Sequence, residues 1–167
     1  ETCNSYNFLK LTRELFKITG EKKYADFYEN TFINAILSSQ NPDTGMTTYF
    51  QPMATGYFKV YSTPFDKFWC CTGTGMESFT KLGDSIYFIK DKLVYINQYV
   101  SSELSIENKD ITIIQEADIP TLNKVIFKVQ SQGQDSCLDL RFRIPDWVNG
   151  SIDISINGKQ AKASKQE

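Results

Sequence analysis

Residues 68–77 read Phe68-Trp69-Cys70-Cys71-Thr72-Gly73-Thr74-Gly75-Met76-Glu77, and they lie close to the point where the sequence changes from helical to extended patterns. Thr74 and Glu77 have the spacing of a capping box, which predicts that a short helix begins at Thr74. Cys70 and Cys71 would then lie just ahead of a helix start. The partial positive charge there favours a thiolate over a thiol, so the stretch predicts a chemical role for the two sulfurs.

Two further side chains that can bind a metal ion lie at the start of the chain, where Glu1 and Cys3 are two residues apart. Together with Cys70 and Cys71 they would form a site of three sulfur ligands and one oxygen ligand. Zinc accepts such a set, with zinc–sulfur distances of about 2.3 Å. The sequence contains no histidine, so the commonest metal ligand and general base is missing. From the residues alone, a structural zinc site is the simplest interpretation, and a catalytic site is its rival.

The composition excludes two classes of partner. With 18 basic and 20 acidic residues the net charge is -2, so the chain lacks the basic field that nucleic-acid binding requires. No apolar run approaches the roughly 20 residues that span a bilayer, which predicts no membrane partner. A hydrophobic content of 41% is enough for a packed core.

The four cysteines could also form disulfides, as in a secreted protein. Neighbouring cysteines such as Cys70 and Cys71 rarely bond to each other, because the ring that they would close strains the peptide link. Cys137 is isolated on a strand-like segment, where we expect a buried side chain. We therefore favour a site over disulfide stapling, and a count of free thiols would separate the two.

The first forty residues predict two amphipathic helices joined as an αα-hairpin. In residues 4–19 apolar side chains recur at three- and four-residue steps until Gly20, and in residues 22–39 a second stripe runs up to Asn41-Pro42. The side chains expected to face the core are Phe8, Leu11, Leu15 and Ile18 in the first helix, Tyr24, Phe27, Tyr28, Phe32, Ala35 and Ile36 in the second, and Met76, Phe79 and Leu82 in the short third helix.

Residues 51–67 form a long aromatic loop with few regular signals. Long loops of this kind are usually functional and often line a binding site. This loop either packs over the ends of the helices or forms one wall of a site for a sugar or another flat ligand. We name Trp69 as the candidate substrate-binding residue. Tyr49, Tyr57 and Tyr61 could also stack on a sugar ring, but such aromatic residues more often belong to a core.

From Ile86 onward the pattern predicts antiparallel β-structure, with strands at 86–90, 93–100, 103–106, 111–115, 124–130, 137–144 and 152–156 and a hairpin turn at Asn157-Gly158. Short strands at this spacing indicate a sandwich. Within residues 138–144 the alternation assigns Leu138, Leu140, Phe142 and Ile144 to the core and Asp139, Arg141 and Arg143 to the solvent.

These motifs, taken in order, resemble those of the β-L-arabinofuranosidase families of glycoside hydrolases, which are grouped as families 127 and 146 and were formerly a domain of unknown function. The resemblance rests on Glu1-Thr2-Cys3, on residues 68–78, on Leu140-Arg141-Phe142-Arg143-Ile144-Pro145-Asp146-Trp147 and on the turn Ile156-Asn157-Gly158. It implies an α+β fold. Residues 1–88 would be the C-terminal helices of an (α/α)6 catalytic barrel, and residues 89–167 would be an incomplete antiparallel β-sandwich.

The resemblance also implies a role for each member of the set. In such enzymes a zinc ion held by one Glu and three Cys lies at the sugar pocket, and the first cysteine of the pair attacks the anomeric carbon. By this correspondence Cys70 would be the catalytic nucleophile, and Glu1, Cys3, Cys70 and Cys71 would bind zinc. The implied activity is the retaining hydrolysis of β-L-arabinofuranosides or related glycans. The alternative is a non-catalytic carbohydrate-binding or assembly module with a structural zinc site.

The resemblance further implies that the chain is a fragment. The family's acid/base glutamate lies upstream of the Glu-x-Cys motif, and its sugar-binding histidines lie in earlier helices, so we expect the isolated chain to be inactive. A partial barrel leaves apolar helix faces uncovered, which predicts self-association.

Overall fold

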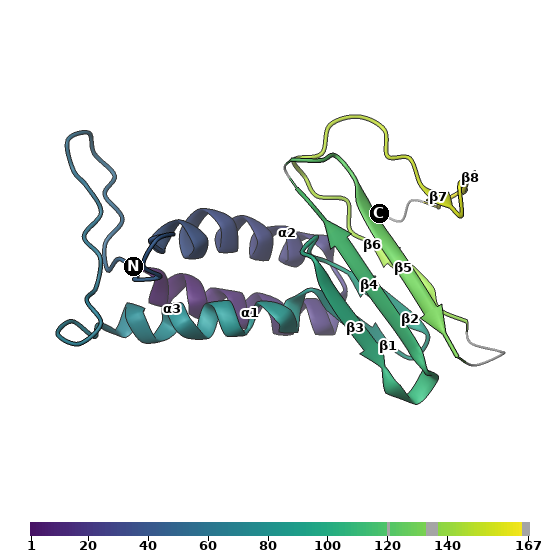
Figure 1. Cartoon of the computed structure of the whole chain (residues 1–167), viewed down its shortest axis with the longest axis horizontal. Coiled ribbons are helices and arrows are strands. Elements are labelled where there is room, and N and C mark those ends of the chain that lie inside the picture. Colours follow the sequence, from purple (N-terminus) through teal and green to yellow (C-terminus); the bar gives the residue numbers. More distant parts are fainter. Residues whose placement is uncertain (120, 133–136, 165–167) are drawn as a thin grey trace.

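A computed structural model describes residues 1–119, 121–132 and 137–164 of the chain. A helical unit comes first and a β unit follows it (Figure 1). Helix α1 (Thr2–Thr19) packs against both α2 (Lys22–Thr31) and α3 (Cys70–Thr80). This is the mixed α+β organisation expected from the sequence. Within the described ranges, no helix is long and apolar enough to cross a membrane.

The ends of the first two helices lie where the sequence predicts them. Gly20 closes α1 in the left-handed conformation (φ 70°), and its N–H donates to the Phe16 carbonyl at 2.7 Å. Helix α2 continues through a π-helical turn, η1 (Phe32–Ile36), and a 3-10 turn, η2 (Leu37–Ser39). Asn41 then starts a turn by accepting the Asp43 N–H on its side-chain oxygen at 2.8 Å.

The helical core uses a different face of α1 from the predicted one. Tyr6, Leu9 and Phe16 are buried, whereas Phe8 and Leu11 are about half exposed and Ile18 is 80% exposed. Leu9 packs with the buried residues of the second helical segment, and Phe79 and Leu82 pack against this cluster as predicted; the cluster comprises Leu9, Tyr28, Phe32 and Ile36. The predicted burial of Phe27 and Met76 is wrong, since both are exposed.

The exposed stripe of α1 continues onto α2, where Phe27 makes an edge contact with Phe8 (ring centroids 6.4 Å apart). Helix α1 is therefore apolar on two faces, and only one of them is covered within the described residues. Periodicity could not show which face packs inward, because both faces satisfy it. The uncovered face is consistent with the expected self-association, which stays a prediction.

Among the described residues, the β unit contains two three-stranded sheets and a short hairpin. In the first sheet β1 (Tyr87–Lys90) pairs with β2 (Leu93–Ile96), and β6 (Asp139–Phe142) pairs with the other edge of β2. The second sheet contains β3 (Ser102–Ile106), β4 (Ile111–Ala117) and β5 (Val125–Ser131). The hairpin of β7 (Ser155–Ile156) and β8 (Lys159–Gln160) turns at Asn157-Gly158, where both residues have positive φ, as predicted.

The expectation of a purely antiparallel β half is wrong at β6, which runs parallel to β2. The chain leaves the first sheet after β2, forms β3, β4 and β5, and then returns beside β2 in the same direction. Parallel neighbours require such a long crossover, whereas a tight turn produces antiparallel ones. Strand patterns identify the strands but not the direction in which a distant strand returns.

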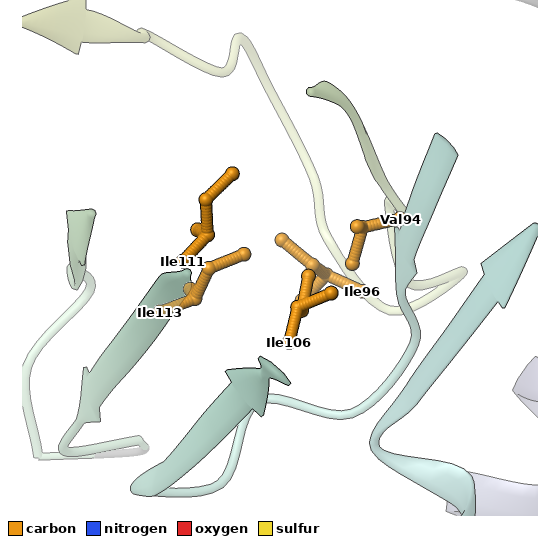
Figure 2. Packing of buried hydrophobic residues seen from close by; sticks show 5 residues of the cluster. All are labelled: Val94, Ile96, Ile106, Ile111 and Ile113. Atoms are coloured by element: carbon orange, nitrogen blue, oxygen red, sulfur yellow. The ribbon is translucent and has the colours of Figure 1, made fainter. Parts of the chain in front are cut away.

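The β core forms where the two sheets face each other (Figure 2). Val94 and Ile96 of β2 meet Ile106, Ile111 and Ile113 of β3 and β4, and all five are buried. Burying a side chain of this size contributes about 1.5–3 kcal/mol. This cluster therefore holds the two sheets together.

The end of β6 departs from the predicted alternation. Leu138, Leu140 and Phe142 pack against the β core as expected, but Arg143 is buried and Ile144 is exposed. The strand ends at Phe142, so the two-residue period does not extend to the next positions. Cys137 is exposed and precedes β6, so the prediction of a buried strand cysteine is wrong.

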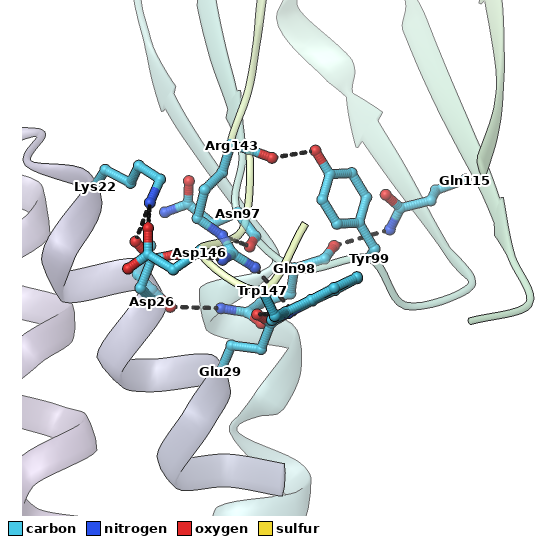
Figure 3. A network of polar contacts seen from close by, with 11 residues as sticks. Lys22, Asp26, Glu29, Asn97, Gln98, Tyr99, Gln115, Arg143, Asp146 and Trp147 are labelled. Atoms are coloured by element: carbon cyan, nitrogen blue, oxygen red, sulfur yellow. Dashed lines mark hydrogen bonds and ion pairs between the residues drawn. The ribbon is translucent and has the colours of Figure 1, made fainter. Parts of the chain in front are cut away.

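Arg143 joins the β unit to helix α2 (Figure 3). Its side chain is 2% exposed, and its guanidinium lies 2.6 Å from the Asp26 carboxylate and 2.9 Å from that of Glu29. The Arg143 Nε also donates to the Asn97 carbonyl at 2.6 Å. A buried cation between two largely buried carboxylates is therefore the main polar contact between α2 and the end of β6.

Residues that follow Arg143 extend this contact. Trp147 donates its indole N–H to Glu29 at 2.9 Å, and Lys22 pairs with both Asp26 and Asp146. The stretch quoted for the family resemblance thus contacts one face of α2 (Figure 3). These contacts fix how the β unit sits on α2, which in turn packs against the cysteine-bearing helix α1.

Candidate metal centre

Helix α3 begins at Cys70 and not at Thr74. Trp69 is the N-cap in an extended conformation, and the Thr72 N–H donates back to the Trp69 carbonyl at 2.9 Å. The predicted capping box is therefore wrong. Thr74 lies one turn inside the helix, and Glu77 accepts a hydrogen bond from the Tyr6 hydroxyl of α1. Cys70 and Cys71 instead occupy the first two helical positions, where backbone N–H groups lack helical partners and the positive end of the dipole lies.

The structure brings the four predicted ligand residues together. Glu1 and Cys3 stand at the start of α1, and Cys70 and Cys71 stand at the start of α3. One ligand atom from each residue lies within 4.8 Å of the others. Because α1 and α3 pack against each other with these two starts at the same end, residues about seventy positions apart in sequence converge.

The donor set fits a tetrahedral zinc site. The Cys3 and Cys71 sulfurs lie 3.5 Å apart, and the Cys70 sulfur lies 3.9 Å from a Glu1 carboxylate oxygen. Two sulfurs bound to one zinc ion at about 2.3 Å in tetrahedral geometry are separated by about 3.8 Å. All four cysteines of the chain are free thiols. The spacing and the S3O chemistry are therefore consistent with zinc.

The pKa values of the Cys3 and Cys71 thiols are shifted in opposite directions. Burial raises the pKa of Cys3 to about 12, and the neighbouring cysteines Cys70 and Cys71 also raise it. A hydrogen bond from the Thr74 hydroxyl has the opposite effect and lowers the pKa of Cys3. Burial is also the largest effect on Cys71 and opposes its ionisation, but hydrogen bonds from Cys3 and Thr2 outweigh it and lower the pKa of Cys71. A bound cation would therefore be needed to hold Cys3 as a thiolate at neutral pH.

Aromatic side chains form an open apolar hollow beside the cluster. Trp69, the N-cap of α3, lines it together with Tyr49, Tyr57 and Phe58. The Tyr49 and Trp69 rings make an edge contact with centroids 5.9 Å apart. The segment between η2 and α3 extends away from the helices at the end where the N-terminus lies (Figure 1). Side chains of the loop thus line a hollow next to Trp69, at the end of the helices where the cluster lies.

Tyr49, for which the sequence favoured a core position, instead lines the hollow beside the cluster. Repulsion from the Glu1 carboxylate, and then from Cys70, raises the pKa of Tyr49. Thr74 is a second residue whose place was missed, because its hydroxyl contacts the Cys3 sulfur at 3.2 Å. No sequence pattern around Tyr49 or Thr74 predicts these contacts, because Glu1 and Cys3 lie far from them in the sequence.

Gly75 permits the close approach of α3 to the segment that precedes the aromatic loop. A Cβ at Gly75 would lie 2.9 Å from the Thr47 methyl carbon. We expect Gly75→Ala to lower the free energy of unfolding by about 1–3 kcal/mol, because the buried Thr47 must move. Urea denaturation measures the effect, with Gly83→Ala as the matched control, since nothing lies within 4 Å of a Cβ added there. Equal midpoints for the two variants would contradict this account.

Fold and site together define a helical unit that carries a sulfur-rich candidate metal centre and is joined by buried ion pairs to a β unit. Residues 1–84 match the family model described as the β-L-arabinofuranosidase GH127 catalytic domain. Residues 93–167 match the model of the GH127 middle domain. The chain belongs to the GH127 β-L-arabinofuranosidase family.

Individual relatives agree with this assignment. The chain is 23% identical over 181 residues to a non-reducing end β-L-arabinofuranosidase of Bifidobacterium longum subsp. longum, an alignment that covers 100% of the chain and 27% of that protein. The solved GH127 β-arabinofuranosidase BT3674 is 25% identical with a TM-score of 0.80, over 99% of this chain and 28% of that one. Ara127N-Se, a GH127 β-L-arabinofuranosidase from Geobacillus stearothermophilus T6, is 24% identical with a TM-score of 0.73, over 97% and 27%. The chain thus spans just over a quarter of the length of these relatives.

Proposed function

We propose that the chain is the metal-binding, nucleophile-bearing part of a retaining glycoside hydrolase that acts on β-L-arabinofuranosides or related glycans. The observation that carries the proposal is the convergence of Glu1, Cys3, Cys70 and Cys71 in a chain of the GH127 family. The relatives are themselves named β-arabinofuranosidases, and we extend that substrate class to this chain. The hollow lined by Trp69 and Tyr49 would hold the sugar ring.

The different burial of the three thiols supports separate roles. Cys71 is buried and Cys3 is partly buried, whereas Cys70 is exposed. A purely structural zinc site is closed, while a catalytic site keeps an open position. We therefore assign Cys70 as the nucleophile and zinc ligand, and Glu1, Cys3 and Cys71 as the anchoring ligands. Bound zinc would keep the sulfurs as thiolates and withdraw charge from them.

The reaction would proceed by two displacements at one carbon. The Cys70 sulfur attacks the anomeric carbon, so that a carbon–sulfur bond forms as the glycosidic carbon–oxygen bond breaks, and an acid residue protonates the departing oxygen. The same residue then takes a proton from water as the water oxygen bonds to this carbon, the carbon–sulfur bond breaks to release the Cys70 thiolate, and the second inversion restores the original configuration. The acid/base residue would come from a part of the enzyme outside this chain, so the chain alone would be inactive.

We further propose that α1, α2 and α3 belong to the C-terminal part of an (α/α)6 barrel and that residues 89–167 begin a β-sandwich domain. The apolar face of α1 with Phe8, Leu11 and Ile18 supports the first assignment, because further barrel helices would cover it. The core between the two sheets supports the second. In the isolated chain, the same helix face would promote self-association.

Metal analysis tests the proposed centre. We expect about one zinc ion per chain, and we expect Cys71→Ser to lose most of it because three ligands bind zinc far more weakly than four. Cys137→Ser is the matched control, since Cys137 is exposed and lies outside the cluster. Removal of zinc with a chelator should lower the melting temperature of the wild-type chain. An unchanged zinc content in Cys71→Ser would contradict the ligand assignment.

A further inference from the structure

The hydroxyl of Thr74 touches both halves of the candidate metal centre. Thr74 lies one turn after Cys70 on α3, and its oxygen donates to the Cys70 carbonyl at 3.2 Å. The same oxygen lies 3.2 Å from the Cys3 sulfur of α1. Thr74 does not cap α3, because Trp69 holds the N-cap position. Helix capping therefore does not explain why a threonine stands at position 74.

We propose that Thr74 is a positioning residue that directs the Cys3 sulfur toward the metal by donating a hydrogen bond to it. The inference rests on the metal centre proposed above. A metal-bound Cys3 sulfur carries no proton and can only accept, and a threonine hydroxyl has a single proton to donate. The Thr74 hydroxyl then turns from the Cys70 carbonyl to the Cys3 sulfur. Hydrogen bonds of this kind orient metal ligands and tune the charge that they place on the metal.

A second contact between the same helices keeps Thr74 in place. The Tyr6 hydroxyl, one turn after Cys3, donates to Glu77, which lies one turn after Thr74. Tyr6 is buried between the helices, and its bond to Glu77 raises the pKa of Tyr6 to about 12, so it stays a neutral donor. The two contacts are parallel steps along one seam between α1 and α3. Together they set the register in which the Cys3 and Cys70 ends of the helices meet.

Cobalt(II) is the probe that tests the role of Thr74, since its sulfur-to-metal charge-transfer band reports on the thiolate directly. Titration of the intact wild-type protein and of Thr74→Val, in competition with a chelator, gives the cobalt affinity. We expect Thr74→Val to bind cobalt about 10–100-fold more weakly. We also expect its charge-transfer band at lower energy, because a sulfur without the hydrogen bond is a stronger donor. Thr74→Ser should keep the wild-type values.

Thr72→Val is the matched control, because Thr72 lies on the same helix and its buried hydroxyl has no hydrogen-bond partner among the described residues. Thr74→Ala, which removes the hydroxyl without adding bulk, should repeat the effect of Thr74→Val. Wild-type affinity and band energy in both Thr74→Val and Thr74→Ala would overturn the role of Thr74 and leave the metal centre standing. An equal loss in Thr72→Val would also overturn it. A wild-type protein without any sulfur–cobalt band would overturn the proposed metal centre itself.

Discussion

Replacing Cys70 by Ser in a protein with the full length of its relatives is expected to lower kcat on an aryl β-L-arabinofuranoside by at least about 10³-fold. Cys70 is the exposed sulfur of the cluster, at the first position of α3. A serine hydroxyl at that position is a weaker nucleophile than a thiolate and a poorer leaving group in the second displacement. Both steps of the proposed reaction therefore slow down. Steady-state kinetics measures the loss, and mass spectrometry of wild-type protein during turnover should find a sugar adduct on Cys70.

Two controls separate the nucleophile from the metal ligand. Cys137→Ser, which changes an exposed sulfur outside the cluster, should keep the wild-type kcat. The zinc content of Cys70→Ser shows whether the variant is inactive because it has lost zinc or is inactive although it still binds zinc. A wild-type rate in Cys70→Ser would remove the nucleophile assignment. A wild-type protein that holds zinc but turns over no glycoside would favour the alternative, a non-catalytic module with a structural zinc site.

The second large effect is expected at Arg143, where Arg143→Met should lower the free energy of unfolding by about 3–5 kcal/mol. The substitution leaves the Asp26 and Glu29 carboxylates largely buried without their common cation (Figure 3). Their side chains are only 13% and 12% exposed, so little water reaches them, and only Lys22 and the Trp147 indole remain as partners of Asp26 and Glu29. Urea denaturation measures the loss.

Arg141→Met is the matched control for this prediction, because Arg141 stands on the same segment but is exposed and contacts Tyr95 only at the surface. Such a contact contributes about 0–1 kcal/mol. Replacing Arg143, Asp26 and Glu29 together by apolar residues should recover part of the loss, since no charge is then buried without a partner. Equal destabilisation by the two arginine variants would show that the ion pairs do not hold the β unit on α2.

Local sequence signals predicted the elements of this chain well, because those signals act over a few residues. Gly20 ends α1 through its left-handed conformation, and Asn157-Gly158 turns the last hairpin for the same reason. The hairpin of β1 and β2 likewise turns at the predicted residues, with Asp91 at positive φ. The capping-box pattern misled, because its two residues lie inside α3 and contact α1 instead.

Side-chain orientation was predictable only where one face of an element is apolar. Helix α1 has two apolar faces, so its sequence does not show that Leu9 packs inward while Leu11 remains uncovered. Arg143 follows the end of β6, where alternation stops, and its partners Asp26 and Glu29 precede it by more than a hundred residues. A pattern within a segment carries no information about a partner so distant.

The sequence by itself determined which residues are the candidates for a metal centre, since Glu1, Cys3, Cys70 and Cys71 are a donor set that zinc accepts. It also determined the order of helices and strands, because turn chemistry and periodicity are local properties. Only the tertiary structure decided that α1 and α3 bring Glu1, Cys3, Cys70 and Cys71 within 4.8 Å of one another. It also decided that Thr74 contacts Cys3, that Arg143 is buried and that β6 runs parallel to β2. Each of these depends on packing between segments distant in sequence, which no local pattern encodes.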